Sequence, residues 1–294
     1  MEFGTDNHPP YLLHQPAEQR VPFVFNSPHS GRQYPTSLMA ASGLSAMDIR
    51  RSEDLFVDQL FAGVVNLGAP LLTAEFPRAW LDVNREPYEL DPKLFVEPLP
   101  PHANSRSMRV AGGLGTVPRV VAENLQIYRQ RPSLAEALWR IENVYRPYHE
   151  TLRSLMARTS VMFGYAVLVD CHSMPSNGSR SEGQSRPDII VGDRYGTSCD
   201  GDISRAIMRQ FADRGYSVTR NKPYAGGFIT EHYGRPLKGL HAVQIEINRG
   251  LYVNETTLEP TIGFTALASD IIDVVANVMS LPDSGFYGQS IAAE

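Results

Sequence analysis

The stretch Tyr165-Ala-Val-Leu-Val-Asp-Cys-His-Ser173 decides the fold prediction. Apolar residues run from Tyr165 to Val169 without alternating with polar ones, and Asp170 and His172 then follow abruptly. An unbroken, β-branched apolar run is typical of a strand that is buried on both faces, as in the parallel sheets of α/β proteins. Ligands of such sheets bind beyond the carboxyl ends of the strands. We therefore expect His172 at a binding edge, with Asp170 on the same side of the strand because side chains alternate.

Other strand-like runs also carry polar residues within or just after them. A single His at a strand end can simply cap backbone groups, but repetition of the pattern favours a functional site. The runs are residues 21–26, which lead into His29, residues 242–249, which contain Glu246, and residues 80–84, which are followed by Arg85.

The composition predicts a globular protein with a large core. The chain has 294 residues, a hydrophobic content of 42% and a formal net charge of −5, which disfavours a nucleic-acid partner. No stretch has the apolar length of a transmembrane helix, and the first residues do not resemble a secretion signal. Cys171 and Cys199 are too few for a disulfide framework. We expect a cytoplasmic protein without a membrane partner, either a monomer or a small homo-oligomer.

Helical and strand patterns alternate along the chain without a repeat or a linker. We expect residues 1–20 to form an irregular arm and residues 21–294 to form a single catalytic α/β domain. Besides the runs above, the pattern predicts strands at residues 70–75, 188–192 and 216–219, and a loop at residues 221–238. The predicted helices cover residues 45–67, 134–155 with a bend at Pro147, 200–215 and 261–281.

His29, His172 and a carboxylate from the predicted helix 45–67 could form a metal site. Two imidazoles and one carboxylate, with a further position left to water, are a standard ligand set for catalytic zinc. Asp54 and Asp58 would share one side of that helix, although carboxylates there also serve as caps or interact with the helix dipole. The dispersed spacing alone is a weak signal, because no His-Glu-x-x-His motif is present. Cys171 alternates away from His172 and is expected in the core.

A series of short motifs stands in order along the chain: Ser27-Pro-His29-Ser-Gly-Arg32, Ser52-Glu-Asp54-Leu-Phe-Val-Asp58, Asp82-Val-Asn84-Arg85, Asp170-Cys-His172-Ser173, Pro187-Asp188-Ile-Ile-Val-Gly192, Gly226-Gly227 with Thr230, and Gln244-Ile-Glu246-Ile-Asn-Arg249. Together these motifs resemble the N-formylglutamate amidohydrolase (N-formylglutamate deformylase) family. The resemblance covers roughly residues 22–255 and implies a fold similar to the zinc carboxypeptidases (phosphorylase/hydrolase-like). That fold is a three-layer α/β/α arrangement around a mixed, mostly parallel sheet of the eight-stranded type.

The resemblance implies roles for individual residues. His29 and His172 would be zinc ligands, and Glu246 would be the carboxylate that acts on the zinc-activated water. Asn84 and Arg85 would bind the substrate carboxylate, by analogy with an Asn-Arg pair in the carboxypeptidases. Arg85 is therefore counted with Glu246 among the catalytic residues.

The third zinc ligand is the main departure from the carboxypeptidase pattern. Carboxypeptidases take a His and a Glu from one His-x-x-Glu turn, whereas this chain has Arg32 three residues after His29. The third ligand must then come from another segment. Asp54 is the preferred candidate, with Glu53 and Asp58 as alternatives.

Further arginines and a glycine pair complete the predicted substrate site. Arg109 and Arg186, together with Arg106, could stabilise an oxyanion or bind a side-chain carboxylate, although arginines are common on protein surfaces. Gly227 and Thr230 are placed with the substrate-binding residues. Residues 98–118 and 173–186 are long, polar and Gly-bearing, and are expected to border the pocket as mobile segments.

The implied reaction is hydrolysis of N-formyl-L-glutamate, or a related N-acyl amino acid, to formate and L-glutamate. Zinc would lower the pKa of its water to about 7. Proton transfer by Glu246 would add a rate factor of roughly 10²–10⁴. One alternative is a zinc deacylase or carboxypeptidase-like hydrolase of another N-acyl amino acid. The other is a catalytically silent protein that binds small carboxylates, which the presence of Glu246 disfavours.

Overall fold

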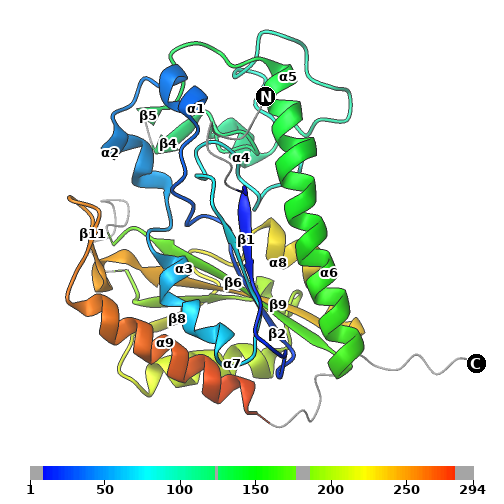
Figure 1. The fold of residues 1–294 in the computed structure, drawn as a ribbon, viewed down its shortest axis with the longest axis vertical. Coiled ribbons are helices and arrows are strands. Elements are labelled where there is room, and N and C mark those ends of the chain that lie inside the picture. The colour runs from blue at the N-terminus through cyan, green and yellow to red at the C-terminus, as the bar shows by residue number, and fades with distance from the viewer. Residues whose placement is uncertain (1–8, 123–124, 177–185, 282–294) are drawn as a thin grey trace, which may run out of the picture. The chain divides into compact units, whose positions relative to one another are not determined.

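The computed structural model describes residues 9–122, 125–176 and 186–281 (Figure 1). The chain forms two compact units and passes between them repeatedly. The first comprises Met1–Leu12, Pro28–Glu53 and Thr73–Leu152, and the second comprises Leu13–Ser27, Asp54–Leu72 and Arg153–Glu294. The single domain over residues 21–294 stays a prediction.

The central sheet is mixed, which confirms the predicted fold class. Strands β2 and β6, β6 and β9, and β7 and β8 pair in parallel, whereas β7 and β9 pair antiparallel. Among the described residues the sheet has seven strands, one fewer than the eight-stranded type implied by the resemblance. Their order is β1 (Tyr11–His14), β3 (Leu71–Ala74), β2 (Phe23–Ser27), β6 (Ala166–Met174), β9 (Leu240–Asn248), β7 (Ile189–Gly192) and β8 (Val218–Arg220).

The second unit packs helices on both faces of β6 and β9. On one face, Val169 and Cys171 of β6 and Ile245 of β9 share an apolar core with helices α3 (Val57–Leu60), α7 (Gly201–Ala212) and α9 (Gly263–Met279). Helix α8 (Phe228–Tyr233) contacts β6 and β9 and contributes no residue to that core. Because side chains alternate along a strand, Asp170 and His172 of β6 and Gln244 and Glu246 of β9 lie on the face opposite the apolar core.

The remaining elements of the second unit are short. They are the 3₁₀ turns η2 (Ala62–Val65), η4 (Arg194–Gly196), η5 (Pro236–Lys238) and η6 (Arg249–Leu251) and the hairpin of β10 (Val253–Asn254) and β11 (Glu259–Pro260). The predicted loop at 221–238 is wrong in part, because it contains α8 and η5.

The first unit consists mostly of loops and short helices, and shares one long helix with the second. Its elements are α1 (Thr36–Ala41), α2 (Ala46–Ile49), η1 (Arg50–Ser52), α4 (Met108–Ala111), the antiparallel pair of β4 (Val120–Ala122) and β5 (Leu125–Gln126), α5 (Leu134–Arg140), the π turn η3 (Ile141–Tyr145) and the shared helix α6 (Arg146–Phe163). The π turn ends just before Pro147, whose missing N–H and bulky ring disfavour regular α-helical bonding to the preceding turn.

The predicted helix over residues 45–67 is wrong. The chain forms α2 and η1, leaves the helical conformation at Glu53, and forms α3 and η2 only after Phe56, whose φ of 57° is left-handed. A left-handed residue with a side chain cannot continue a right-handed helix. Asp54 therefore lies in the break and does not stack with Asp58 on one helix. None of the helices in the described part of the chain is long and apolar enough to cross a membrane.

The predicted strand at residues 80–84 is also wrong. Trp80 N–H donates to Pro77 O at 2.9 Å, and Asn84 N–H donates to the side chain of Asp82 at 2.8 Å. Local turns thus bind two of these N–H groups, and Asp82 N–H donates to the distant Thr116 O at 2.8 Å. An Asp side chain competes with a strand ladder for nearby N–H groups. Conversely, the predicted irregular arm at 1–20 contains β1.

Candidate metal and substrate site

Strand register places His172 and Glu246 side by side. In the parallel pair β6–β9, His172 lies opposite Glu246 and Asp170 lies opposite Gln244. Residues that lie opposite each other on paired strands point to the same face of the sheet. Because neighbouring strands are about 4.8 Å apart, the side chains of each pair are neighbours. Both His172 and Glu246 are buried. Two residues that are distant in sequence thus meet at the predicted end of the central strand.

Carboxylates face both ring nitrogens of His172. Its Nδ1 lies 2.8 Å from Asp54 Oδ2, and its Nε2 lies 2.8 Å from Asp170 Oδ2. Asn26 Nδ2 in turn donates to Asp170 Oδ1 at 2.7 Å. Burial alone would lower the pKa of His172, but Asp170 and Asp54 raise that pKa well above its usual value. A cation placed between Nδ1 and Asp54 would replace the proton there, since metal ligands must be deprotonated.

Asp54 is held by a buried arginine as well as by His172. Arg249 Nη2 lies 3.2 Å from Asp54 Oδ1, and Arg249 Nε donates to Ser173 Oγ at 3.0 Å. One carboxylate oxygen of Asp54 therefore faces His172 and the other faces a fixed guanidinium. Arg249 is the last residue of the strand-like run at 242–249, and the sequence patterns predict no role for it.

His29 has its own carboxylate partner. Its Nε2 lies 2.8 Å from Asp82 Oδ1. Asp82 Oδ2 accepts from Arg78 Nε at 2.9 Å and lies 3.5 Å from Arg85 Nη2. Burial opposes ionisation of Asp82, but Arg78, Arg85 and His29 together hold its pKa well below the usual value. Asp82 therefore carries its charge at neutral pH.

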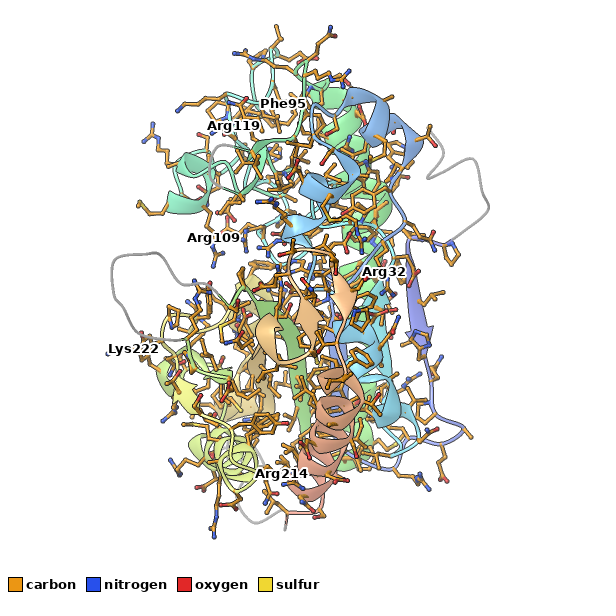
Figure 2. The ribbon with its side chains drawn as sticks, turned by 90° about the vertical axis from the view of Figure 1, so that its left-hand side faces the viewer. Arg32, Phe95, Arg109, Arg119, Arg214 and Lys222 are labelled. Carbon is orange, nitrogen blue, oxygen red and sulfur yellow. The ribbon has the colours of Figure 1, made fainter. Side chains whose placement is uncertain are left out.

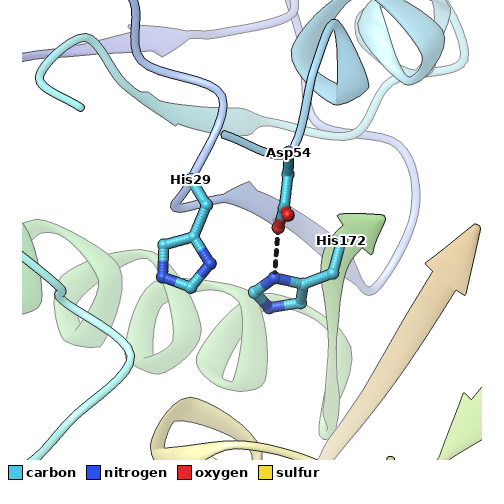
Figure 3. Close-up of side chains that lie close together, drawn as sticks. All are labelled: His29, Asp54 and His172. Carbon is cyan, nitrogen blue, oxygen red and sulfur yellow. Dashed lines mark hydrogen bonds and ion pairs between the residues drawn. The ribbon is translucent and has the colours of Figure 1, made fainter. Parts of the chain in front are cut away.

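His29, Asp54 and His172 form a buried group that could hold a metal ion. Each offers a ligand atom, and these atoms lie within 4.8 Å of one another (Figure 3). The donor set fits a catalytic metal, because it consists of two imidazoles and a carboxylate. The alternative ligand Glu53 instead accepts hydrogen bonds from Tyr34 and Arg50. Asp58 is not part of the group.

Glu246 belongs to a chain of hydrogen bonds on the face of the sheet that α8 contacts. Gln244 Nε2 donates to Glu246 Oε1 at 2.8 Å, and Gly227 N–H donates to Gln244 Oε1 at 2.9 Å. Thr230 Oγ1 donates to Gly227 O at 2.8 Å. Gly227 and Thr230 thus interact with one another and with Gln244, and their predicted contact with substrate stays a prediction.

Arg85 is almost fully buried in the first unit. It donates from Nε to Leu114 O at 3.0 Å and from Nη1 to Asn84 O at 2.7 Å. Burial lowers the pKa of Arg85 to about 10, with Asp82 opposing the shift and Arg78 and Arg109 adding to it. The guanidinium is therefore still charged at neutral pH.

The other predicted arginines differ in their surroundings. Arg109 extends from α4 (Figure 2) and forms no hydrogen bond or ion pair with another described residue through its side chain. Arg186 donates to Tyr224 OH at 3.1 Å and lies over its ring. Arg106 is exposed. The predicted mobile segment at 173–186 lies largely outside the described residues, since 177–185 are among those not described.

Comparison with known proteins identifies the family. Residues 21–253 match the model of the N-formylglutamate amidohydrolase family. The chain belongs to this family. It is 31% identical over 240 residues to the N-formylglutamate deformylase of Pseudomonas putida, covering 81% of this chain and 84% of that protein. It is 30% identical over 239 residues to the deformylase of Pseudomonas aeruginosa, covering 80% and 84%.

The fold agrees with a solved member of the N-formylglutamate amidohydrolase family. The crystal structure of the N-formylglutamate amidohydrolase from Ralstonia eutropha JMP134 matches with a TM-score of 0.86 and 32% identity. The match covers 92% of this chain and 98% of that one. The family resemblance and the fold class expected from the sequence are therefore confirmed.

Sequence reasoning missed three residues of this amidohydrolase site. Asp82, Arg249 and Gln244 each bond to a predicted site residue. Their one available signal was that each stands in a motif that carried the family resemblance. Nothing in the local pattern indicated which residue each would meet.

Proposed function

We propose that this amidohydrolase hydrolyses N-formyl-L-glutamate, or a closely related N-acyl amino acid, to formate and the free amino acid, with zinc as its metal. The names of the two Pseudomonas relatives support the substrate. The observation that carries the proposal is the buried His29–Asp54–His172 group with Glu246 beside His172. This arrangement combines a candidate cation site with a carboxylate, Glu246, that could accept and donate a proton.

The donor set supports zinc in particular. His29 and His172 each direct Nε2 to a carboxylate outside the proposed ligand set, from Asp82 and Asp170, while Nδ1 of His172 faces the proposed ligand Asp54. Such carboxylate–histidine pairs are typical of zinc sites, because they fix the ring orientation and raise its basicity. When bound, zinc supplies Lewis-acid chemistry: it lowers the pKa of water and polarises a carbonyl oxygen.

Glu246 is proposed as the general base. It is a buried carboxylate in a strand, and the strand register sets it opposite the proposed ligand His172. From its place next to His172, it would accept a proton from the attacking water and deliver it to the departing nitrogen. General acid–base help of this kind contributes roughly 10²–10⁴-fold to the rate.

The arginines of the first unit are proposed to bind the carboxylates of the substrate. Arg85 has five N–H groups, of which its bonds to Leu114 O and Asn84 O and its ion pair with Asp82 engage three. The others could hold the α-carboxylate together with Asn84, since arginine binds carboxylates in a bidentate manner. Arg109 is proposed for the side-chain carboxylate, with Arg186 as a further candidate.

A formate-release assay with metal analysis tests the proposal. The purified protein should contain close to one zinc ion per chain and release formate from N-formyl-L-glutamate. Glu246→Gln keeps the shape but cannot take a proton, so kcat should fall by at least about 100-fold while zinc content stays unchanged. Parallel assays with N-acetyl-L-glutamate and neutral N-formyl amino acids separate this function from a deacylase of another substrate. Binding of L-glutamate without turnover of any substrate would indicate a silent binding protein and refute the proposal.

A further inference from the structure

Gln244 lies between a glycine turn and the proposed base. Its Nε2 donates to Glu246 Oε1 at 2.8 Å, and its Oε1 accepts from Gly227 N–H at 2.9 Å. Gln244 is 4% exposed and Glu246 is 8% exposed, so water competes little for these bonds. The two residues are two apart on β9 and share one face of the strand.

The orientation of the Gln244 amide follows from its neighbours. A backbone N–H can only donate, so the atom of Gln244 that faces Gly227 must be the oxygen. The NH₂ group must then point to Glu246, and it requires an acceptor there. The hydrogen bond between Gln244 and Glu246 therefore forms with the carboxylate oxygen of Glu246 as its acceptor.

The turn that supplies the Gly227 N–H is itself built to hold one shape. Gly226 has a φ of 124°, which disfavours any residue with a side chain. A Cβ on Gly226 would lie 2.4 Å from Thr230 Oγ1, and that hydroxyl is engaged with Gly227 O at 2.8 Å. Thr230 is fully buried in α8. Thr230 thus holds the peptide group of Gly227 through its carbonyl, and the N–H of Gly227 orients the amide of Gln244.

We propose that Thr230, Gly227 and Gln244 form a relay of hydrogen bonds that positions the Glu246 carboxylate for catalysis. Gly227 and Thr230 then act through Gln244 and not by binding the substrate. The inference rests on the proposed function, because it takes Glu246 to be the base. A base must be within hydrogen-bond reach of the proton that it takes, and a misplacement of about 1 Å can cost roughly 100-fold in rate. Residues that orient a base should therefore affect kcat more than KM.

Substitutions at two points of the relay test the proposal. Gln244→Met keeps the length of the side chain but removes both hydrogen bonds, so kcat should fall by about 10- to 100-fold. KM should stay within about twofold and zinc content should be unchanged, because neither the arginines nor the ligands are altered. Thr230→Val keeps the volume and removes only the hydroxyl, so a smaller loss of kcat is expected. Thr230→Ser restores the hydroxyl and should recover most of that loss.

Ser198→Ala is the matched control. Ser198 is buried, and its Oγ donates at 2.8 Å to the carbonyl of Ala242, which lies on β9 like Gln244. Its removal costs one buried hydrogen bond next to β9 but leaves the relay intact. The control should lower the melting temperature about as much as Thr230→Val while kcat stays normal.

The outcomes separate the relay from the proposed function. If the wild-type protein releases formate and Gln244→Met keeps a normal kcat, the relay is refuted and the function stands. An equal loss of kcat in Ser198→Ala and Thr230→Val would also refute it, because the effect would then be one of stability. If the wild-type protein hydrolyses none of the N-acyl amino acids, both the proposed function and the catalytic role of the relay fall.

Discussion

Asp82→Asn should weaken zinc binding without changing any proposed zinc ligand. Asp82 is buried and bonds to His29 Nε2 at 2.8 Å through one oxygen and to Arg78 Nε at 2.9 Å through the other. Asparagine has nearly the same shape, but it has no charge and one of its oxygens is replaced by an NH₂ group. His29 would lose the anionic partner that sets its tautomer and its ring orientation.

The magnitude of the effect follows from the contacts. Loss of the carboxylate behind a metal-binding histidine typically costs about 10- to 100-fold in affinity, or about 1.4 to 2.8 kcal/mol. Neutralising one partner of a buried ion pair costs about 3–5 kcal/mol of folding stability. The Arg78 side chain is 25% exposed, so water compensates in part and the lower end, about 3 kcal/mol, is expected.

Asp91→Asn provides a control in the same unit. Asp91 Oδ2 lies 2.8 Å from Arg119 Nε, and the Arg119 side chain is 22% exposed, so this pair resembles Asp82–Arg78. Within the described part of the chain, Asp91 forms no hydrogen bond or ion pair with a histidine. Both variants should lose stability in urea unfolding. In competition with a chromophoric chelator, Asp82→Asn alone should lose zinc affinity. Equal zinc affinities of the two variants would refute the role given to Asp82.

Three further predictions concern other parts of the molecule. His172→Ala should lose its zinc, as measured by elemental analysis, while its circular dichroism spectrum stays that of a folded protein; full zinc content would contradict the ligand assignment. Arg85→Lys keeps the charge but loses the planar guanidinium, so KM for N-formyl-L-glutamate should rise about 10-fold or more with a smaller fall in kcat. An unchanged KM would exclude binding of the substrate carboxylate by Arg85. Burial would raise the pKa of Asp193, but hydrogen bonds from Arg220 and Asn221 outweigh it and lower the pKa below its usual value of 3.8. The stability that this shift provides is present above the usual pKa and is lost as the pH falls through the lowered one. The difference in unfolding free energy between the wild type and Arg220→Gln should therefore be constant near neutral pH and shrink below about pH 4, and a difference that grew in acid would contradict this account.

Local sequence patterns predicted the strands that carry the site. The apolar runs that became β2, β6 and β9 could be recognised because a strand buried on both faces needs continuous apolar residues, whatever its neighbours are. His172 and Glu246 could be recognised because they interrupt the apolar runs of β6 and β9, and His29 because it closely follows the run of β2. The order of the motifs along the chain was enough to indicate the family.

Local patterns failed where tertiary contacts override them. The apolar spacing of residues 45–67 is helical, but the chain breaks before α3, and Asp54 lies in that break. The apolar run at 80–84 is strand-like, but Asp82 binds the backbone N–H of Asn84 and a turn results. At residues 80–84 a polar side chain thus offers the backbone an alternative to regular structure. At the break before α3, the OH of the distant Tyr252 donates to Leu55 O at 2.8 Å.

The sequence by itself determined which residue types stand at the strand ends, because hydrophobic periodicity is a property of neighbouring residues. Only the tertiary structure decided which of them meet. His29 and Asp82 are 53 residues apart, Asp54 and His172 are 118 apart, and Asp54 and Arg249 are 195 apart. Such contacts depend on strand order and register, which follow from the packing of the whole sheet and leave no trace in local spacing.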